Sequence, residues 1–399
     1  MTSQTVEAAT GARRRDELAL WSGLALCMGV GPVMLYTLSA VSTPVIDDLG
    51  LSDGQYGAIA TVTFGSAALG ALVLGGPTSR LSARTVMVGV AVGSGAGLVL
   101  LALAPTYGVV IAAAVVAGVA QSLSNPATNR MVAELPAQRR GALIGWKQSG
   151  VQMSQLLGGV LAPSIAVLVG WRWTPAVGVL IALAAVVAAL AIRLPHTTEA
   201  AKTSERVGGR VSVATLTAYT LFMGFGLQAT NAYLPLFAHR RLGFDLRTAG
   251  LTAAVVGSVG LVSRIWWARS SDRDGLKPTT LVTLAGGSAL GVLLALLSPA
   301  LGGWLVWVGA GVFGAAALAS NAVTMVALLH SVPRATLGVA TGLLVTGMYV
   351  GFAAGPLAFG LALDHGASFD VAWLLPLAAF AVAGVVGLLP ALTRPRHNS

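Results

Sequence analysis

The stretch GLVSRIWWARSSDRDGLK, residues 260–277, decides the fold of this chain. It is the end of an apolar run followed by a polar turn, and Arg264 lies inside the apolar part. A weaker version of the turn, PTSRLSAR, occupies residues 77–84, and its Arg80 precedes Arg273 by 193 positions. An apolar run that ends twice in a similar charged turn predicts a chain built from two related halves.

The composition indicates a membrane protein. The chain has 399 residues, of which 55% are hydrophobic and only 10% are charged, and its mean hydropathy is +0.80. A soluble protein of this size exposes more charge than that. A helix needs roughly 20 apolar residues to cross a bilayer, and a barrel strand needs about ten with strict alternation. The long apolar runs therefore predict an all-α polytopic membrane protein and exclude an outer-membrane barrel.

The sequence contains twelve apolar runs that we expect to cross the membrane. They are Leu18–Ser42, Gly54–Gly76, Thr85–Ala104, Tyr107–Asn129, Ala142–Val169, Trp173–Ile192, Val213–Phe237, Thr248–Ala268, Thr279–Pro299, Trp304–Leu328, Leu337–Leu363 and Val371–Leu392.

The distribution of basic residues predicts the orientation. Most of the 24 lysines and arginines lie on the side of the N-terminus. Cytoplasmic loops are rich in such residues, so we expect a multi-pass plasma-membrane protein with both termini in the cytoplasm. The opposite side carries only Arg172, Arg240, Arg241 and Arg247, and the group around Arg240 is an exception to the rule.

The two halves of the sequence repeat. We expect an N-terminal six-helix bundle at residues 1–195, a polar cytoplasmic linker at 196–211 and a C-terminal six-helix bundle at 212–399. At offsets of 193 to 197, residues of the first half recur in the second; examples are Gly57 with Gly250, Ser124 with Ser320, Asn125 with Asn321, Thr128 with Thr324, and Gly150 with Gly347. Gly347, Gly351 and Gly355 also form a smooth helical face that predicts close packing.

The turn Asp272-Arg273-x-Gly275-x-Lys277, which closes an apolar helix, resembles the cytoplasmic signature of the major facilitator superfamily. The resemblance implies two six-helix halves that expose a midplane site alternately to each side. It also implies that the turn latches the outward-open state, although a solvated turn that only sets topology is the alternative. In the first-half copy serines replace the acid and the glycine, so Arg80 needs another partner, for which we predict Glu134.

Two cations lie inside apolar runs. Arg264 and Lys147 have Ala71 and Leu344 as their partners in the repeat, so each one breaks the internal symmetry. A charge at this depth usually faces the bundle interior or a wet cavity. We expect that both bind an anionic solute. The alternatives are that Arg264 braces the turn below it and that Lys147 extends to the membrane surface.

Further polar residues on the predicted helices are candidates for solute binding. Gln148, Gln152 and Gln155 share one helical face because they are four and three positions apart. The other candidates are Gln121, Asn125, Asn321, Gln228, Asn231 and Tyr36. Helix packing through hydrogen bonds is the alternative for Asn125 and Asn321, and a wet vestibule is the alternative for Gln228, Asn231 and Tyr36.

The function we predict is secondary active transport of a small polar, anionic organic solute. By our boundaries no acid lies in the middle of a helix, which leaves the coupling ion unknown, with the proton as one candidate. The sequence shows no metal cluster, phosphate-binding loop or nucleophile with its base, so we expect no enzyme activity, metal or cofactor. We expect a monomer that contacts a small-molecule solute and the bilayer but no nucleic acid. The alternatives are a multidrug or metabolite efflux permease and, less favoured, a non-transporting membrane sensor.

Overall fold

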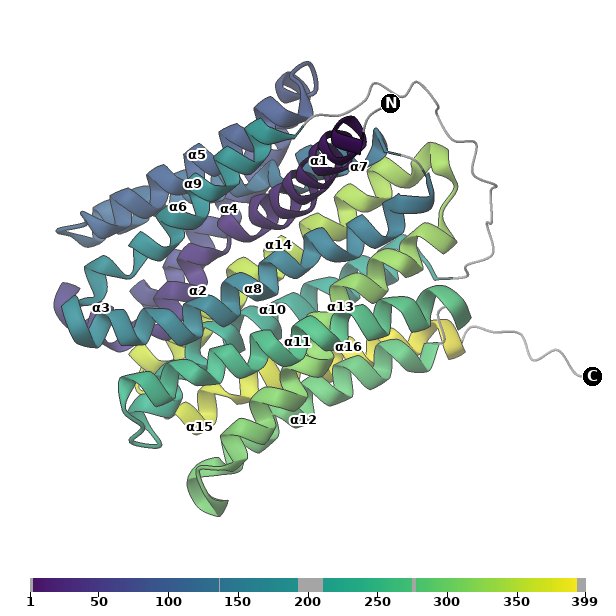
Figure 1. Ribbon diagram of the computed structural model, residues 1–399. Helices are drawn as coiled ribbons and strands as arrows, with labels where there is room; N and C mark the ends of the chain where they lie inside the picture. The colour runs from purple at the N-terminus through teal and green to yellow at the C-terminus, as the bar shows by residue number, and fades with distance from the viewer. Residues whose placement is uncertain (1–2, 136, 193–210, 275–277, 393–399) are drawn as a thin grey trace, which may run out of the picture. The chain divides into compact units, whose positions relative to one another are not determined.

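The computed structural model describes residues 3–135, 137–192, 211–274 and 278–392, and it is helical over these ranges with no strand (Figure 1). The helices in chain order are α1 Ser3–Val30, α2 Val33–Ala40, α3 Ser42–Leu49, α4 Asp53–Thr78, α5 Ala83–Ala102, α6 Tyr107–Ser122, α7 Ser124–Ala133, α8 Ala137–Val169, the 3₁₀ turn Trp171–Trp173, α9 Pro175–Ala191, α10 Val213–Arg240, α11 Leu246–Asp274, α12 Pro278–Leu301, α13 Leu305–Ser331, α14 Arg334–Asp364, α15 Phe369–Ala372 and α16 Leu374–Leu392.

The prediction of an all-α polytopic membrane protein is confirmed. Among the described residues, ten helical segments are long and apolar enough to cross a membrane. The bent pair of Asp16–Val30 and Val33–Ala40 makes an eleventh. The remaining predicted crossing corresponds to α10, a helix of 28 residues that carries the polar residues Gln228 and Asn231.

Prolines interrupt two of the helices that the sequence predicted to be continuous. The first predicted span bends by 56° between α1 and α2, where Gly31 and Pro32 stand. The fourth breaks at Leu123 into α6 and α7, three residues before Pro126. Proline has no amide hydrogen to donate to the carbonyl four residues earlier, and its ring crowds that carbonyl. The helix therefore breaks in the turn before the proline.

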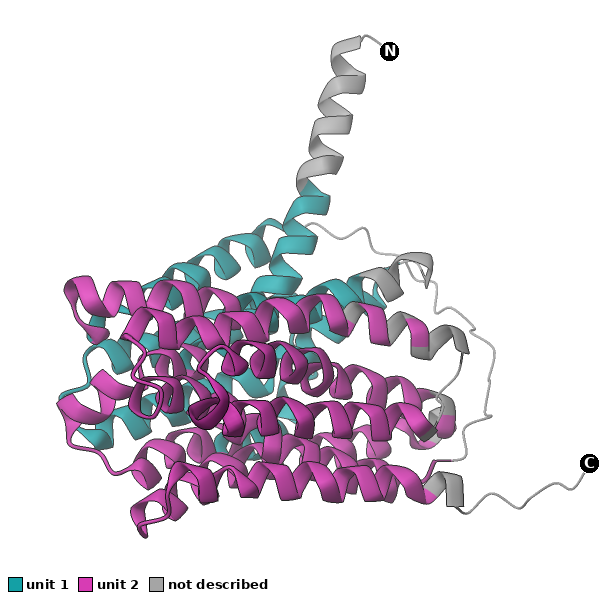
Figure 2. Ribbon diagram, turned by 90° about the horizontal axis from the view of Figure 1, so that it is seen from below, with its two compact units in different colours: residues 1–34, 66–154, 172–202 teal, residues 35–65, 155–171, 203–399 magenta. Residues whose placement is uncertain are grey.

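The chain divides into two compact units (Figure 2). Unit 1 comprises residues 1–34, 66–154 and 172–202, and unit 2 comprises residues 35–65, 155–171 and 203–399. Segments of the first sequence half thus belong to the same unit as the second half. The predicted linker at 196–211 lies almost entirely outside the described residues, and the predicted bundle boundaries stay a prediction.

Unit 1 is organised around α1, α5 and α9. The helix α5 packs on α6, α7 and α9, and α1 packs on α9. Their buried side chains form one apolar cluster that includes Leu24, Cys27, Val90 and Ala189. Gly150 of α8 lies against the backbone of Ala25 in α1, where a Cβ atom would collide with it.

Unit 2 is organised around α10. This helix packs on α11, α13, α14 and α16, and α12 packs on α13 and α16. The predicted glycine face of α14 is the surface that meets α10: Gly347 lies against Thr217, and Gly351 lies against Leu221. Helices in lipid gain little from hydrophobic burial against each other, so close backbone packing of this kind holds them together.

A helix crossing occurs twice in unit 2. Gly57 of α4 lies against the carbonyl of Pro356 in α14, and Gly250 of α11 lies against the carbonyl of Gly159 in α8. The sequence repeat has offsets of 193 and 197 in these helices, so position 57 corresponds to 250 and position 159 to 356, and the second contact is the repeat image of the first. The sequence repeat is therefore a repeat of helix packing.

The glycine face of α14 gives a matched stability test. Replacing Gly351 by alanine places a Cβ atom against the Leu221 carbonyl, whereas a Cβ atom at Gly342 in the same helix meets nothing within 4 Å. We expect Gly351→Ala to cost about 1–3 kcal/mol through overpacking. Gly342→Ala should be neutral or slightly stabilising because alanine favours the helix. Thermal unfolding in detergent measures both, and equal melting temperatures would contradict the packing role of this face.

Candidate functional site

A small pocket in unit 2 is lined by residues of α2, α4 and α10. Three of the predicted site residues, Tyr36, Gln228 and Asn231, line it. The other lining residues are Leu35, Leu38, Ser39, Tyr56, Ile59, Ala60 and Ala232. Gln228 and Asn231 are three residues apart on α10 and therefore share one helical face. The structure thus brings together polar residues that lie almost 200 positions apart in the sequence.

Asn231 is held firmly at the edge of this pocket. Its side chain is 4% exposed, and its Oδ1 accepts a hydrogen bond of 3.0 Å from Nε2 of Gln155 in α8. The hydroxyl of Ser39 donates to the backbone carbonyl of Asn231. Asn231 Nδ2 and Gln155 Oε1 are buried, and neither has a hydrogen-bond partner within the described part of the chain. Buried amides are nearly always satisfied, so these two atoms stand out.

Arg264 lies within electrostatic range of Tyr36, a lining residue of the pocket. Its side chain is partly buried, and it lies at the end of the apolar part of α11, from which the helix continues to Asp274. Arg264 is not itself a lining residue. Solute binding by Arg264 stays a prediction.

Lys147 is buried in unit 1, where its side chain is only 1% exposed. Its Nζ donates to Asn125 Oδ1 at 3.2 Å, Thr128 Oγ1 at 2.9 Å and Asn129 Oδ1 at 2.6 Å. An ammonium group has three donors, and neutral oxygens of α7 accept all three. The alternative that Lys147 extends to the membrane surface is therefore wrong, because α7 solvates its charge locally. An anion at Lys147 would have to replace one of these oxygens.

The remaining predicted binding residues lie in both units. In unit 1, Gln148 donates to Asn125 at 3.2 Å and Gln152 is 1% exposed. Gln121 packs against Gly31, and its buried Oε1 has no partner among the described residues. In unit 2, Asn321 lies on α13, away from the lining of the pocket. Solute binding by these four residues stays a prediction.

The repeated Ser-Asn-x-x-Thr positions behave differently in the two halves. Thr128 accepts a hydrogen bond from Lys147 of another helix, as the packing interpretation expects. In the second half Ser320 and Thr324 donate to carbonyls of their own helix, at Ala317 and Ser320. The interhelical hydrogen bond therefore depends on Lys147, which the second half lacks.

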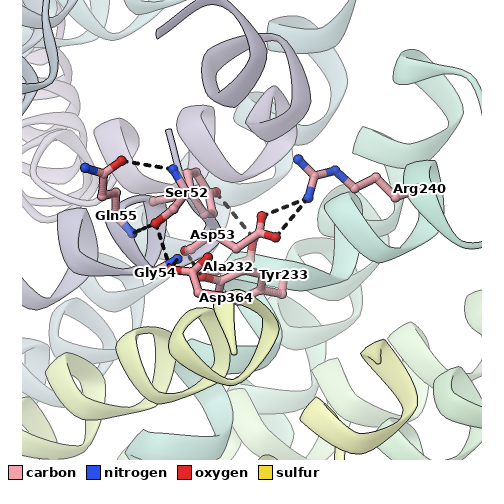
Figure 3. A network of polar contacts seen from close by, with 9 residues as sticks. Ser52, Asp53, Gly54, Gln55, Ala232, Tyr233, Arg240 and Asp364 are labelled. Carbon is pink, nitrogen blue, oxygen red and sulfur yellow. Dashed lines mark hydrogen bonds and ion pairs between the residues drawn. The ribbon is translucent and has the colours of Figure 1, made fainter. Parts of the chain in front are cut away.

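A polar network at one end of unit 2 ties the start of α4 to α10 and α14 (Figure 3). Arg240 Nη1 lies 2.8 Å from Asp53 Oδ1, and the Tyr233 hydroxyl donates to the Asp53 carbonyl at 2.6 Å. Asp364 accepts from the Ser52 hydroxyl at 2.7 Å and from the Gly54 amide at 2.9 Å. Asp53 lies at the N-terminus of α4 and Arg240 lies at the C-terminus of α10, so this pair also complements the dipoles of its own helices.

This network was not among the predictions from the sequence, although a local signal was present. Ser52 and Gln55 form a capping box. The backbone amide of Gln55 donates to Ser52 Oγ at 3.1 Å, and the backbone amide of Ser52 donates to Gln55 Oε1 at 2.9 Å. Ser-x-x-Gln before an apolar run is the sequence pattern of such a box. It marks the start of α4, but it says nothing of the partners on α10 and α14.

Arg240 and Arg241, which are exceptions to the orientation rule, both have acidic partners. Arg240 pairs with Asp53, and Arg241 lies 3.4 Å from Asp370. Nearby, Asp245 precedes α11 and accepts a hydrogen bond from the Thr248 hydroxyl, which lowers the pKa of that carboxyl. The orientation rule counts basic residues whether or not acids pair with them, so the predicted orientation stays a prediction.

The predicted latch is only partly described. Gly275 and Lys277 lie outside the described residues, and Asp272 and Arg273 are described only as part of the helix α11. In the first-half turn, Arg130 donates to the carbonyls of Thr78 and Leu81. Arg130 thus braces the turn that follows α4, where a cation also suits the helix dipole. Arg80 and Glu134 are both exposed, and their pairing stays a prediction.

Comparison with known proteins identifies relatives over most of the chain. The sequence profile of the Major Facilitator Superfamily matches residues 24–356. A Haemophilus influenzae protein assigned to metabolite transport is 24% identical over 64% of this chain and 66% of its own length, so the chain spans just under two thirds of it. The transcription regulatory protein OpdE of Pseudomonas aeruginosa is 24% identical over 76% of this chain and 77% of its own length.

Solved structures share the fold. A bacterial homologue of the human lysosomal transporter Spinster, in an inward-facing and unoccupied conformation, matches with a TM-score of 0.73 and 16% identity. The match covers 95% of this chain and 97% of the homologue. The nucleoside transporter NupG matches with a TM-score of 0.70 and 15% identity, over 95% of this chain and 100% of NupG.

The internal repeat supplies a control for the role of the three α7 oxygens that accept hydrogen bonds from Lys147. Thr128 and Thr324 are both fully buried and both donate to the carbonyl four residues earlier, but only Thr128 accepts from a lysine. We expect Thr128→Val to lower the free energy of unfolding by about 1–3 kcal/mol, because it leaves a buried charge with an unmet hydrogen bond. Thr324→Val should cost less.

The double variant Thr128→Val/Lys147→Met tests the cause. It removes the charge together with its acceptor, so its melting temperature in detergent should lie above that of Thr128→Val alone. If Thr128→Val and Thr324→Val lower the melting temperature equally, and adding Lys147→Met to Thr128→Val does not raise it, the α7 oxygens do not solvate the lysine.

Proposed function

Because this chain belongs to the Major Facilitator Superfamily, we propose that it is a secondary active transporter for a small anionic organic solute. It is a multi-pass membrane protein of a superfamily of transporters, which agrees with the prediction that it is no enzyme. We place it in the plasma membrane, with both termini in the cytoplasm and with a site that opens alternately to each side.

The observation that carries the proposal is the position of Arg264 beside the polar pocket. A cation inside an apolar helix is costly, and such residues usually mark a solute or ion path. Arg264 lies within electrostatic range of Tyr36, whose side chain lines the pocket together with Gln228 and Asn231. A guanidinium group forms two parallel hydrogen bonds with a carboxylate, so it suits an organic acid.

The lining of the pocket combines polar and apolar side chains. Ser39, Gln228 and Asn231 contribute polar groups, Tyr36 and Tyr56 are aromatic with hydroxyls, and the other five lining residues are aliphatic. The polar side chains support a small polar solute, and the apolar share of the lining keeps efflux of hydrophobic compounds as the second candidate.

The network around Asp53 supports a role as a gate. It joins residues 52–54, from the first sequence half, to α10 and α14 of the second. Alternating access requires contacts between the halves to form at one end of the protein while they separate at the other. We propose that the site is closed at this end and that the network breaks when the site opens there.

Uptake into proteoliposomes across a panel of mono- and dicarboxylates tests the role of Arg264. Loss of a charge-assisted hydrogen bond should lower kcat/KM for the best substrate by roughly 10- to 100-fold in Arg264→Ala. Arg247→Ala is the control, because Arg247 is an exposed arginine on the same helix. Wild-type uptake by both Arg264→Ala and Arg264→Lys would overturn the anion site.

A reversible cross-link tests the gate. We expect Asp53→Cys/Arg240→Cys, made with Cys27→Ala to remove the buried native thiol, to lose uptake when a bifunctional thiol reagent joins the two positions. A reductant that cleaves the link should restore uptake. Asp53→Cys alone, treated in the same way, controls for modification of one position. Undiminished uptake by the cross-linked protein would show that this end need not open.

A further inference from the structure

We propose that Asn231 presents a hydrogen-bond donor to the pocket and that Gln155 sets this polarity. The preferred solute would then carry an uncharged acceptor oxygen, such as a keto or amide carbonyl, in addition to its anionic group. This inference rests on the proposed transport of organic anions and narrows the class of solute.

The donor is the side-chain nitrogen of Asn231. Asn231 lines the pocket and is 4% exposed, and its Nδ2 is buried without a hydrogen-bond partner in the described residues. An unmet buried donor costs stability, whereas a solute oxygen that satisfies it gains affinity. Thr230, its neighbour on α10, shows the ordinary arrangement, because its hydroxyl donates to the Gly226 carbonyl of the same helix.

Gln155 decides which end of the Asn231 amide remains available. Gln155 Nε2 donates to Asn231 Oδ1 at 3.0 Å, which engages the acceptor end and leaves the donor end. Gln155 is 1% exposed and does not line the pocket, so it acts through Asn231 as a positioning residue. The Ser39 hydroxyl, which donates to the Asn231 carbonyl, fixes the backbone at the same point.

The Arg264 cation and the Asn231 donor together predict which organic acids bind most tightly. Arg264 near Tyr36 attracts a carboxylate, and Asn231 donates to a second, neutral oxygen of the same molecule. Sites that hydrogen-bond a polar group discriminate strongly against an analogue that lacks it, because the buried partner is then left unpaired. An oxo acid should therefore bind more tightly than the plain acid of equal length.

Three five-carbon monocarboxylates test the proposal: pentanoate, 2-oxopentanoate and 4-oxopentanoate. Each carries one negative charge at pH 7, and the three differ only in the presence and position of a keto oxygen. In the wild-type protein we expect at least one oxo acid to bind roughly 10-fold more tightly than pentanoate, as measured by thermal shift over a concentration series. Equal binding of all three would overturn the proposal.

Two variants assign the preference to the proposed residues. Asn231→Leu should bring the three affinities together, because the second, neutral oxygen of an oxo acid then loses its donor. Gln155→Met should also reduce the oxo preference although Asn231 is intact, whereas a mere packing role would weaken all three acids equally. Thr230→Val, a buried neighbour outside the lining, should keep the preference. Ligand-free melting temperatures check that each variant is folded, and an oxo preference that survives in Asn231→Leu would contradict the proposal.

Arg264→Ala separates this inference from the proposed function. If the acids bind and Arg264→Ala weakens all of them, but oxo and plain acids bind alike, only the polarity of Asn231 is wrong. If no acid binds, or if Arg264→Ala binds them as the wild type does, the anion proposal fails and this inference fails with it.

Discussion

Close approach of helix backbones is the constraint on which the rest of the structure depends. Lipid offers helices no hydrophobic reason to associate, so they stay together where small residues let backbones touch. Gly57 against Pro356 and Gly250 against Gly159 are two such crossings, related by the internal repeat. They hold segments of the first sequence half, residues 35–65 and 155–171, within the same unit as α10, α11 and α14. The pocket and the polar network around Asp53 both lie in this unit.

The two cations that break the repeat have different surroundings. Lys147 donates to three neutral oxygens of α7, so its charge is already satisfied inside unit 1. Arg264 lies near Tyr36, beside a pocket that also contains amide groups. A buried charge is retained either because the protein solvates it or because a solute does. The structure supports the first role for Lys147, and we propose the second for Arg264.

The sequence predicted local features better than contacts between side chains that lie far apart in the chain. Apolar runs and the positions of glycine and proline predicted the helical fold, the glycine face of α14 and the repeat, because these depend on composition and spacing. The breaks at Pro32 and Pro126 had visible causes, although we predicted continuous helices there. Tyr36, Gln228 and Asn231 were candidates from the sequence, but Gln155 was only one member of a polar face. Its bond to Asn231 joins residues 76 positions apart, which no spacing rule reveals.

By itself, the sequence determined that this chain is a polytopic helical membrane protein with an internal repeat and with two cations that depart from it. Hydropathy and periodicity suffice for this, since each helix must satisfy its own backbone within the bilayer. Only the tertiary structure decided which polar groups meet. Asp53 reaches Arg240, and Lys147 reaches α7 and not the membrane surface. Side-chain partners depend on how helices cross, and crossing depends on packing between segments far apart in the chain.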